Sequence, residues 1–113
     1  MKSAEDIVID VLERPATAVC ISGPMSGLTD FNYPAFFAYE ETLTKQGYSV
    51  LNPARNQPFK EDMTHADWMR LALHQVLQAD EVHLLPGWEK SVGATLERKV
   101  AETLGLKIRT VAR

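Results

Sequence analysis

A carboxylate stands in the middle of a stretch whose pattern is typical of the apolar face of a helix. The stretch is GWEKSVGATLERKVA, residues 87–101, and the carboxylate belongs to Glu97. At about 100° per residue, five small or apolar residues fall within about 60° of it: Gly93, Ala94, Val100, Ala101 and Leu104. An unpaired ionised carboxylate is costly in such a position, so Glu97 must have a partner, a raised pKa or access to a pocket.

The neighbours of Glu97 favour a ligand pocket. Gly93 and Ala101 lie about one turn to either side and are small enough to leave space for a ligand. Ser91 begins the same helix, where its hydroxyl and the free backbone amides can hold an anion or a sugar oxygen. The alternative is that Glu97 pairs with a buried arginine or caps a loop.

Strands and helices alternate from residue 17 onward. The short apolar runs TAVCIS, YSVLNP, EVHLLP and LKIRTV are predicted to be strands, and RNQPFKEDMT to be a loop. Helices are predicted over about 34–46, about 65–79, and from Ser91, as the cap, to near Gly105. This alternation predicts a single-domain α/β fold, a flavodoxin- or Rossmann-like parallel sheet of four to five strands with helices on both faces.

Ligands of such sheets bind beyond the carboxyl ends of the strands. The loops that begin at Gly23, Asn52 and Pro86 all follow strands, so we expect them at that edge. Asn52 either contacts a ligand there or forms a strand-end turn. Arg55 is either a cation for a 5′-phosphate or an ordinary solvated loop arginine. Trp88 either stacks on a base or roofs the pocket, or else it contacts the core or a neighbouring subunit.

Composition limits the class of protein. The chain has 113 residues, enough for one domain, which we place at residues 17–113. Residues 1–16 are predicted to be an N-terminal helical extension, which could pack on the domain or on a neighbouring subunit. The 12 basic and 15 acidic residues give a net charge of −3, which argues against binding of duplex nucleic acid.

Hydropathy and cysteine usage predict where the protein works. No apolar run approaches the roughly 20 residues of a membrane span, so we expect a soluble, cytoplasmic protein. Cys20 is the only cysteine and lies in a predicted buried strand, where it acts as a small core hydrophobe. The three histidines, at 65, 74 and 83, lack the spacing of a metal site, so no metal is expected.

Three segments carry a resemblance to a known family. ISGPMSGLTDFN at 21–32, GYSVLNPA at 47–54 and ADEVHLLPGWEKSVGATLE at 79–97 occur in colinear order within about 90 residues. They resemble nucleoside 2-deoxyribosyltransferase-like proteins, and most closely the small phage and prophage branch known as domain of unknown function 4406. The GPMSG segment alone is weak, whereas LPGWEKSxGAxxE is specific.

The resemblance implies an activity on an N-glycosidic bond. Ser91, Gly93 and Glu97 match the family's SxGxxxE motif, in which serine contacts phosphate or sugar and glutamate is the nucleophile. Glu97 would attack the anomeric carbon of a nucleoside or nucleoside 5′-monophosphate, and water or a second base would resolve the glycosyl-enzyme. The resemblance implies no cofactor, and it implies that the protein forms a homo-oligomer. The residues expected to bind substrate are Gly23, Pro24, Met25, Ser26, Gly27, Asn52, Arg55, Trp88, Ser91 and Gly93.

The sequence departs from the family's pattern at two positions. Cys20 stands where characterised enzymes have a tyrosine, and Ala72 where they have the aspartate that helps to protonate the leaving base. Another group must supply that proton, and the sequence offers four candidates: Asp62, His65, Asp67 and Glu89. The alternative to an enzyme is a module that binds or sequesters a nucleotide without turnover, and a further alternative is a structural oligomer without a ligand.

Overall fold

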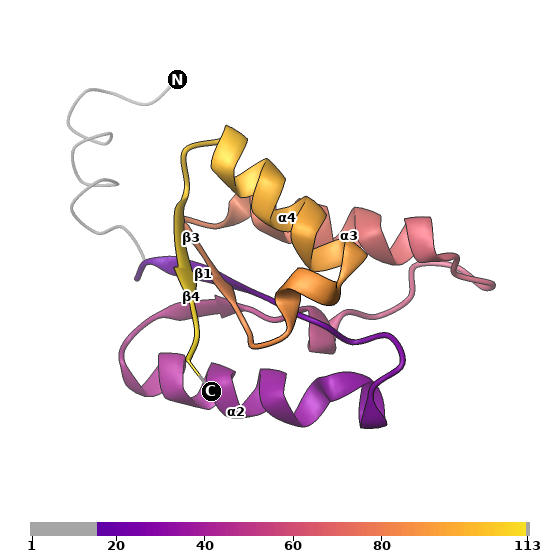
Figure 1. Ribbon diagram of the computed structural model, residues 1–113, viewed down its shortest axis with the longest axis horizontal. Helices are drawn as coiled ribbons and strands as arrows, with labels where there is room; N and C mark the ends of the chain where they lie inside the picture. Colours follow the sequence, from indigo (N-terminus) through magenta and orange to yellow (C-terminus); the bar gives the residue numbers. More distant parts are fainter. Residues whose placement is uncertain (1–15, 113) are drawn as a thin grey trace, which may run out of the picture.

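The protein is a three-layer α/β domain built on a parallel sheet. The computed structural model describes residues 16–112, in which the strands β1 (Ala18–Ser22), β2 (Ser49–Leu51), β3 (Glu81–Leu84) and β4 (Lys107–Thr110) pair in the order β2-β1-β3-β4. One helix, α2 (Tyr33–Lys45), covers one face, and α3 (His65–Gln78) and α4 (Val92–Thr103) cover the other (Figure 1). The predicted α/β fold is confirmed, with four strands.

Each face of the sheet packs its own core. Strand residues alternate between the two faces, so β1 directs Val19 and Ile21 toward α2, and Cys20 toward the opposite helices. The α2 side joins them to Phe36, Leu43 and Leu85. The α3–α4 side packs Val76, Ala79, Val82, Leu84 and Ala101 around Cys20. Cys20 is 1% exposed, which confirms its prediction as a small core residue.

Local signals in the sequence set the helix ends. Thr64 and Asp67 form a reciprocal capping box at the start of α3, and Ser91 Oγ accepts a hydrogen bond from Ala94 N at the start of α4. Asn32 occupies the N-cap position of α2, but its side chain makes no capping bond and donates instead to Pro24 O at 3.0 Å. The predicted GWEK loop contains a short 3₁₀ turn, η3 (Trp88–Lys90).

The loops that follow β1 and β3 pack tightly against each other. A Cβ atom placed on Gly23 would lie 2.8 Å from Leu85 Cβ, so only glycine allows this approach. Gly87 adopts φ +89°, and a Cβ atom there would lie 3.3 Å from Pro24 Cγ. The chain leaves β1 through α2 toward β2 and leaves β3 through α4 toward β4, so the strand order reverses between β1 and β3. This is where sheets of this class bind ligands.

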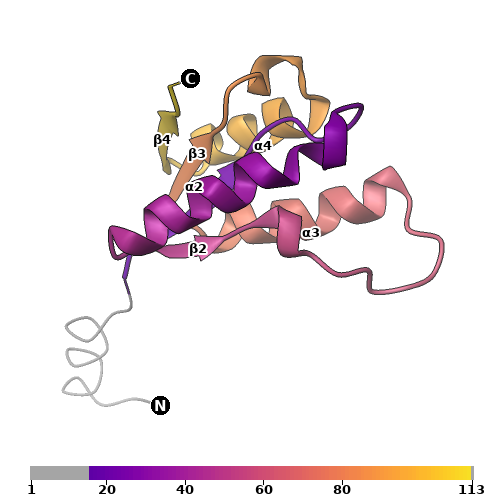
Figure 2. The ribbon, with the colours of Figure 1, turned by 90° about the horizontal axis from the view of Figure 1, so that it is seen from below.

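The remaining features lie outside the sheet and its helices. The segment 56–64, between the short turn η2 (Pro53–Arg55) and α3, projects away from the sheet (Figure 2). The predicted N-terminal helix falls on residues that lie outside the described part of the chain, apart from residue 16. Within residues 16–112 no helix has the length and apolar character needed to cross a membrane.

Candidate active site

Glu97 lies on the buried face of α4, toward the end of β1. It is 7% exposed, and it is buried together with Ala94 and Ala101 on the same face of the helix. The prediction that Glu97 lies on the buried face of the helix is therefore confirmed. Leu104, which was predicted on the same face, is 48% exposed. Its carboxyl group is close to Cys20 and Ser22. Burial and then the charge of Glu97 raise the pKa of the Cys20 thiol. Burial also raises the pKa of Glu97, and the Ser22 hydroxyl lowers it in part.

Burial dominates the acid–base chemistry of Glu97. It raises the pKa of the carboxyl group to about 7 from its ordinary value of 4.5, and the nearby Ser22 hydroxyl offsets part of this rise. Apart from this contact, neither Ser22 Oγ nor Glu97 Oε2 has a hydrogen-bond partner within residues 16–112. No lysine or arginine of this part of the chain forms an ion pair with Glu97. Of the possibilities drawn from the sequence, burial with a raised pKa fits this structure, and pairing with a buried arginine does not.

A cavity between α3 and α4 lies beside this carboxylate. It has a volume of about 410 Å³ and is lined by His65, Ala66, Met69, Arg70, Leu73, Val92, Gly93 and Leu96. Gly93 connects the cavity to Glu97, since a Cβ atom on Gly93 would lie 3.9 Å from Glu97 Oε1. The same atom would lie 3.0 Å from Met69 Sδ. Glu97 itself is not part of the lining, so the Met69 thioether and the Gly93 backbone separate it from the cavity.

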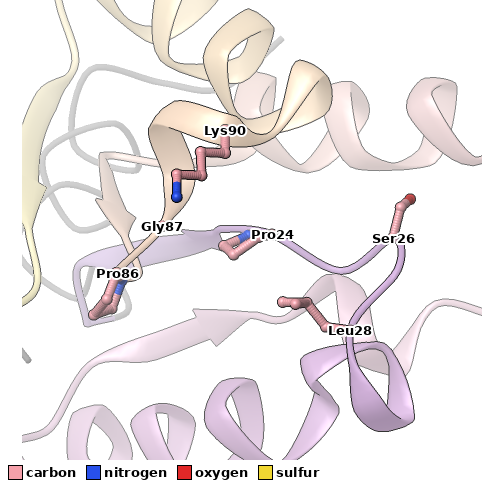
Figure 3. A pocket seen from close by; sticks show the side chains of 6 residues that line it. All are labelled: Pro24, Ser26, Leu28, Pro86, Gly87 and Lys90. Carbon is pink, nitrogen blue, oxygen red and sulfur yellow. The ribbon is translucent and has the colours of Figure 1, made fainter.

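A second cavity, of about 400 Å³, lies between the loops after β1 and β3. Figure 3 shows the Lys90 side chain reaching from η3 toward Pro24 and Pro86, while the Ser26 hydroxyl points away from it. Leu28 and Gly87 complete the lining. A lysine ammonium at the rim of a cavity can bind an anionic group such as a phosphate.

Comparison with known proteins gives the family. Residues 17–110 match the family described as Domain of unknown function (DUF4406). The chain belongs to this family. No curated protein matches it.

In this DUF4406 protein, the predicted GPMSG residues take different positions. Pro24 and Ser26 line the cavity that contains Lys90, and Gly23 makes the close approach to Leu85. Met25 packs against the core on the α2 side. Gly27 adopts φ +78° in an exposed turn with open space around it, so its role there is conformational.

Ser91 and Trp88 flank the start of α4. The Ser91 hydroxyl accepts from Ala94 N at 3.1 Å, which confirms its prediction as the helix cap, and it lines neither cavity. Trp88 is half-buried against the core that α3 and α4 cover. The Arg98 guanidinium lies 5.3 Å from the Trp88 ring centroid. Of the two readings of Trp88, contact with the core is the one seen in this chain.

Asn52 and Arg55 are both engaged with α2. Asn52 is 3% exposed, accepts from Ala54 N at 2.9 Å, and directs its amide toward Glu40 at 3.4 Å. This confirms the strand-end turn. Arg55 makes a two-pronged contact with the Glu40 carboxylate, and its guanidinium lies 4.8 Å from the Phe37 ring centroid. The Arg55 side chain is 62% exposed, so it is a solvated loop arginine in an ion pair with Glu40. A phosphate bound by Arg55 would have to displace Glu40.

The four candidate proton donors differ in their contacts and in their position relative to the cavities. Asp67 accepts from the backbone and hydroxyl of Thr64 and lies 3.1 Å from Lys60 Nζ, and the Thr64 backbone hydrogen bond is the main cause of its lowered pKa. Asp62 and Glu89 are exposed and line neither cavity. His65 lines the cavity beside Glu97. No cluster of three or more potential metal ligands occurs within residues 16–112.

Sequence reasoning missed three residues at the site. Ser22 faces Glu97, and its signal was a hydroxyl at the end of an otherwise apolar strand. Met69 covers Gly93, and Lys90 lines the second cavity. Neither of these two had a local signal, because a methionine on an apolar helical face and a lysine in a loop are both common.

Proposed function

We propose that the protein acts on the N-glycosidic bond of a nucleoside or nucleoside 5′-monophosphate, by deoxyribosyl transfer or by hydrolysis that releases the base. The observation that carries this proposal is the buried carboxyl group of Glu97, which has the Ser22 hydroxyl beside it, forms no ion pair within residues 16–112, and lies behind Gly93 and Met69 from a cavity. A buried carboxyl group without a cationic partner is uncommon in native proteins and calls for an explanation, which a substrate supplies.

The reaction follows from the chemistry of that carboxylate. A carboxylate oxygen of Glu97 attacks the anomeric carbon, the bond from this carbon to the base nitrogen breaks, and the electron pair of that bond leaves with the base. Water or a second base then attacks the same carbon and frees Glu97. Because the pKa of Glu97 is about 7, the ionised, nucleophilic form is available near neutral pH.

Two further features support a nucleotide substrate. The α3–α4 cavity, at about 410 Å³, lies within the range of small-molecule sites and is lined mainly by apolar side chains that suit a base. Lys90 provides a cation beyond the end of β3 for a 5′-phosphate. Met69 separates Glu97 from the first cavity, so productive binding requires its flexible side chain to change rotamer.

The finer family placement forms part of the proposal. We propose that this DUF4406 protein is a member of the nucleoside 2-deoxyribosyltransferase-like group and of its phage and prophage branch, acting in the cytoplasm as a homo-oligomer. Exposed apolar residues on α4 support self-association, since Val92 is 78% exposed and Leu96 is 44% exposed.

A nucleotide-binding module without turnover is the second candidate. Ala72 cannot donate a proton, and the raised pKa of Glu97 keeps much of this residue neutral below pH 7. Both observations favour a site that binds a nucleotide and leaves its glycosidic bond intact.

Base release by wild type and Glu97→Gln distinguishes these functions. The panel contains ribo- and deoxyribonucleosides and their 5′-monophosphates, and Glu102→Gln is the matched control because Glu102 is exposed on the same helix. The enzyme proposal expects release by wild type and the control, and none by Glu97→Gln. Binding of a nucleotide by all three proteins without any release would instead support the binding module, and neither binding nor release would refute both.

A further inference from the structure

An N-glycosidic reaction at Glu97 also needs a proton donor for the leaving base. A base that departs without a proton carries negative charge, and general acid catalysis of such steps contributes about 10²- to 10⁴-fold. The chain has no acid at position 72, where Ala72 lies on the buried face of α3 and is 9% exposed. The donor must therefore come from another residue that can reach the base.

The cavity beside Glu97 holds few ionisable groups. Among its lining residues, only His65 and Arg70 carry side chains that bind protons. A guanidinium does not deprotonate under ordinary conditions, so Arg70 cannot exchange a proton with a substrate. An imidazole can both donate and accept a proton near neutral pH. His65 is exposed and lines the cavity, and Gly93, also in the lining, contacts Glu97.

We propose that His65 is the general acid that protonates the leaving base, in place of the missing acid at position 72. This inference rests on the proposed function and assigns a second catalytic residue to the same site. The first residue of α3 is held in place by the capping box of Thr64 and Asp67 immediately around it. Asp67 is bound within that box and to Lys60, so it positions the start of the helix and does not protonate the base.

The proton balance closes over two steps. In the first, Glu97 forms its bond to the anomeric carbon, the bond to the base nitrogen breaks, and the proton of the His65 imidazolium moves to that nitrogen. In the second, the neutral imidazole accepts a proton from the attacking water while its oxygen displaces Glu97 from the anomeric carbon. Both residues return to their starting states, and no oxidant or cofactor is consumed.

Replacement of His65 with Ala, followed by addition of imidazole, tests this role. The control is His74→Ala, because His74 lies on the same helix, is exposed and bonds only Gln78 among the described residues. With the substrate panel described above, we expect His65→Ala to release base about 10²- to 10⁴-fold more slowly than wild type. Free imidazole should restore a measurable part of this rate, because the position is open to solvent. His74→Ala should match wild type, with or without imidazole.

Three other results have defined meanings. Base release by His65→Ala at the wild-type rate would overturn the assignment while leaving the proposed function intact. A loss that imidazole does not restore, seen also in the more conservative His65→Gln, would make the role of His65 structural and would equally overturn it. No release by wild type from any substrate would refute the proposed function itself, and this inference with it.

Discussion

Replacement of Glu97 with Gln should stabilise the protein above pH 7. Burial raises the pKa of this carboxyl group from 4.5 to about 7, so the folded state holds a proton that the unfolded state releases between these values. The contribution of Glu97 to stability is therefore fully present below about pH 4.5 and is lost as the pH rises through 7. A neutral glutamine has nearly the shape of the protonated acid and avoids this loss.

The size of the effect follows from the difference between the two pKa values. A shift from 4.5 to about 7 corresponds to roughly 3 kcal/mol of unfolding free energy. For a domain of this size such a change moves the midpoint of thermal unfolding by about 10 °C. At pH 8 we expect the unfolding free energy of Glu97→Gln to exceed that of wild type by up to roughly 3 kcal/mol. At pH 4.5 the two proteins should have the same stability.

Urea unfolding at several pH values between 4.5 and 8.5 measures this difference. Glu102→Gln is the control, because the Glu102 carboxylate is exposed and, among residues 16–112, forms only an i,i+4 pair with Arg98. The control should follow the wild-type profile within about 0.5 kcal/mol at every pH. The reasoning would be refuted if wild type and Glu97→Gln showed the same pH dependence, or if the variant were the less stable protein at pH 8.

Three further outcomes are expected. Ser91→Ala should lower the free energy of unfolding by about 1 kcal/mol in urea titrations, because it removes the bond to Ala94 N; an unchanged midpoint would contradict this. Gly93→Ala should slow base release about tenfold or more, because the added methyl group would press on Met69 Sδ at 3.0 Å and disturb the site. The stability of this variant should change little. The Cys20 thiol should resist a thiol reagent in the folded protein and react in urea, because burial raises its pKa; rapid reaction without denaturant would show that the thiol is accessible.

Local patterns in the sequence predicted the elements and the position of Glu97. The period of α4 reports which residues share a face, so Glu97 could be placed with Ala94 and Ala101 without any knowledge of the sheet. The serine at its start, Ser91, marked the boundary in the same way. Alternation of strand and helix then predicted the parallel sheet.

Contacts between distant elements could not be predicted in this way. Arg55 looked available for phosphate because nothing near it in the sequence shows that Glu40, on α2, holds its guanidinium. The covering of Gly93 by Met69 depends on how α3 packs against α4. His65 was one of four candidate acids, and only the cavity separated it from the others.

The central position of β1 also determines the order in which the site can assemble. Ala18 N, at the start of β1, bonds Asp80 Oδ2, 62 positions along the chain, whereas β2 lies much closer in sequence. Closure of longer loops is slower, so the pairing of β1 with β3 should follow that of β1 with β2. Glu97 faces the end of β1 from α4, which follows β3 in the chain, so we expect its burial to follow this late pairing. Between pH 4.5 and about 7 the protein would then take up a proton at that stage. Refolding in the presence of a pH-indicator dye would therefore show a slow phase of proton uptake that Glu97→Gln lacks.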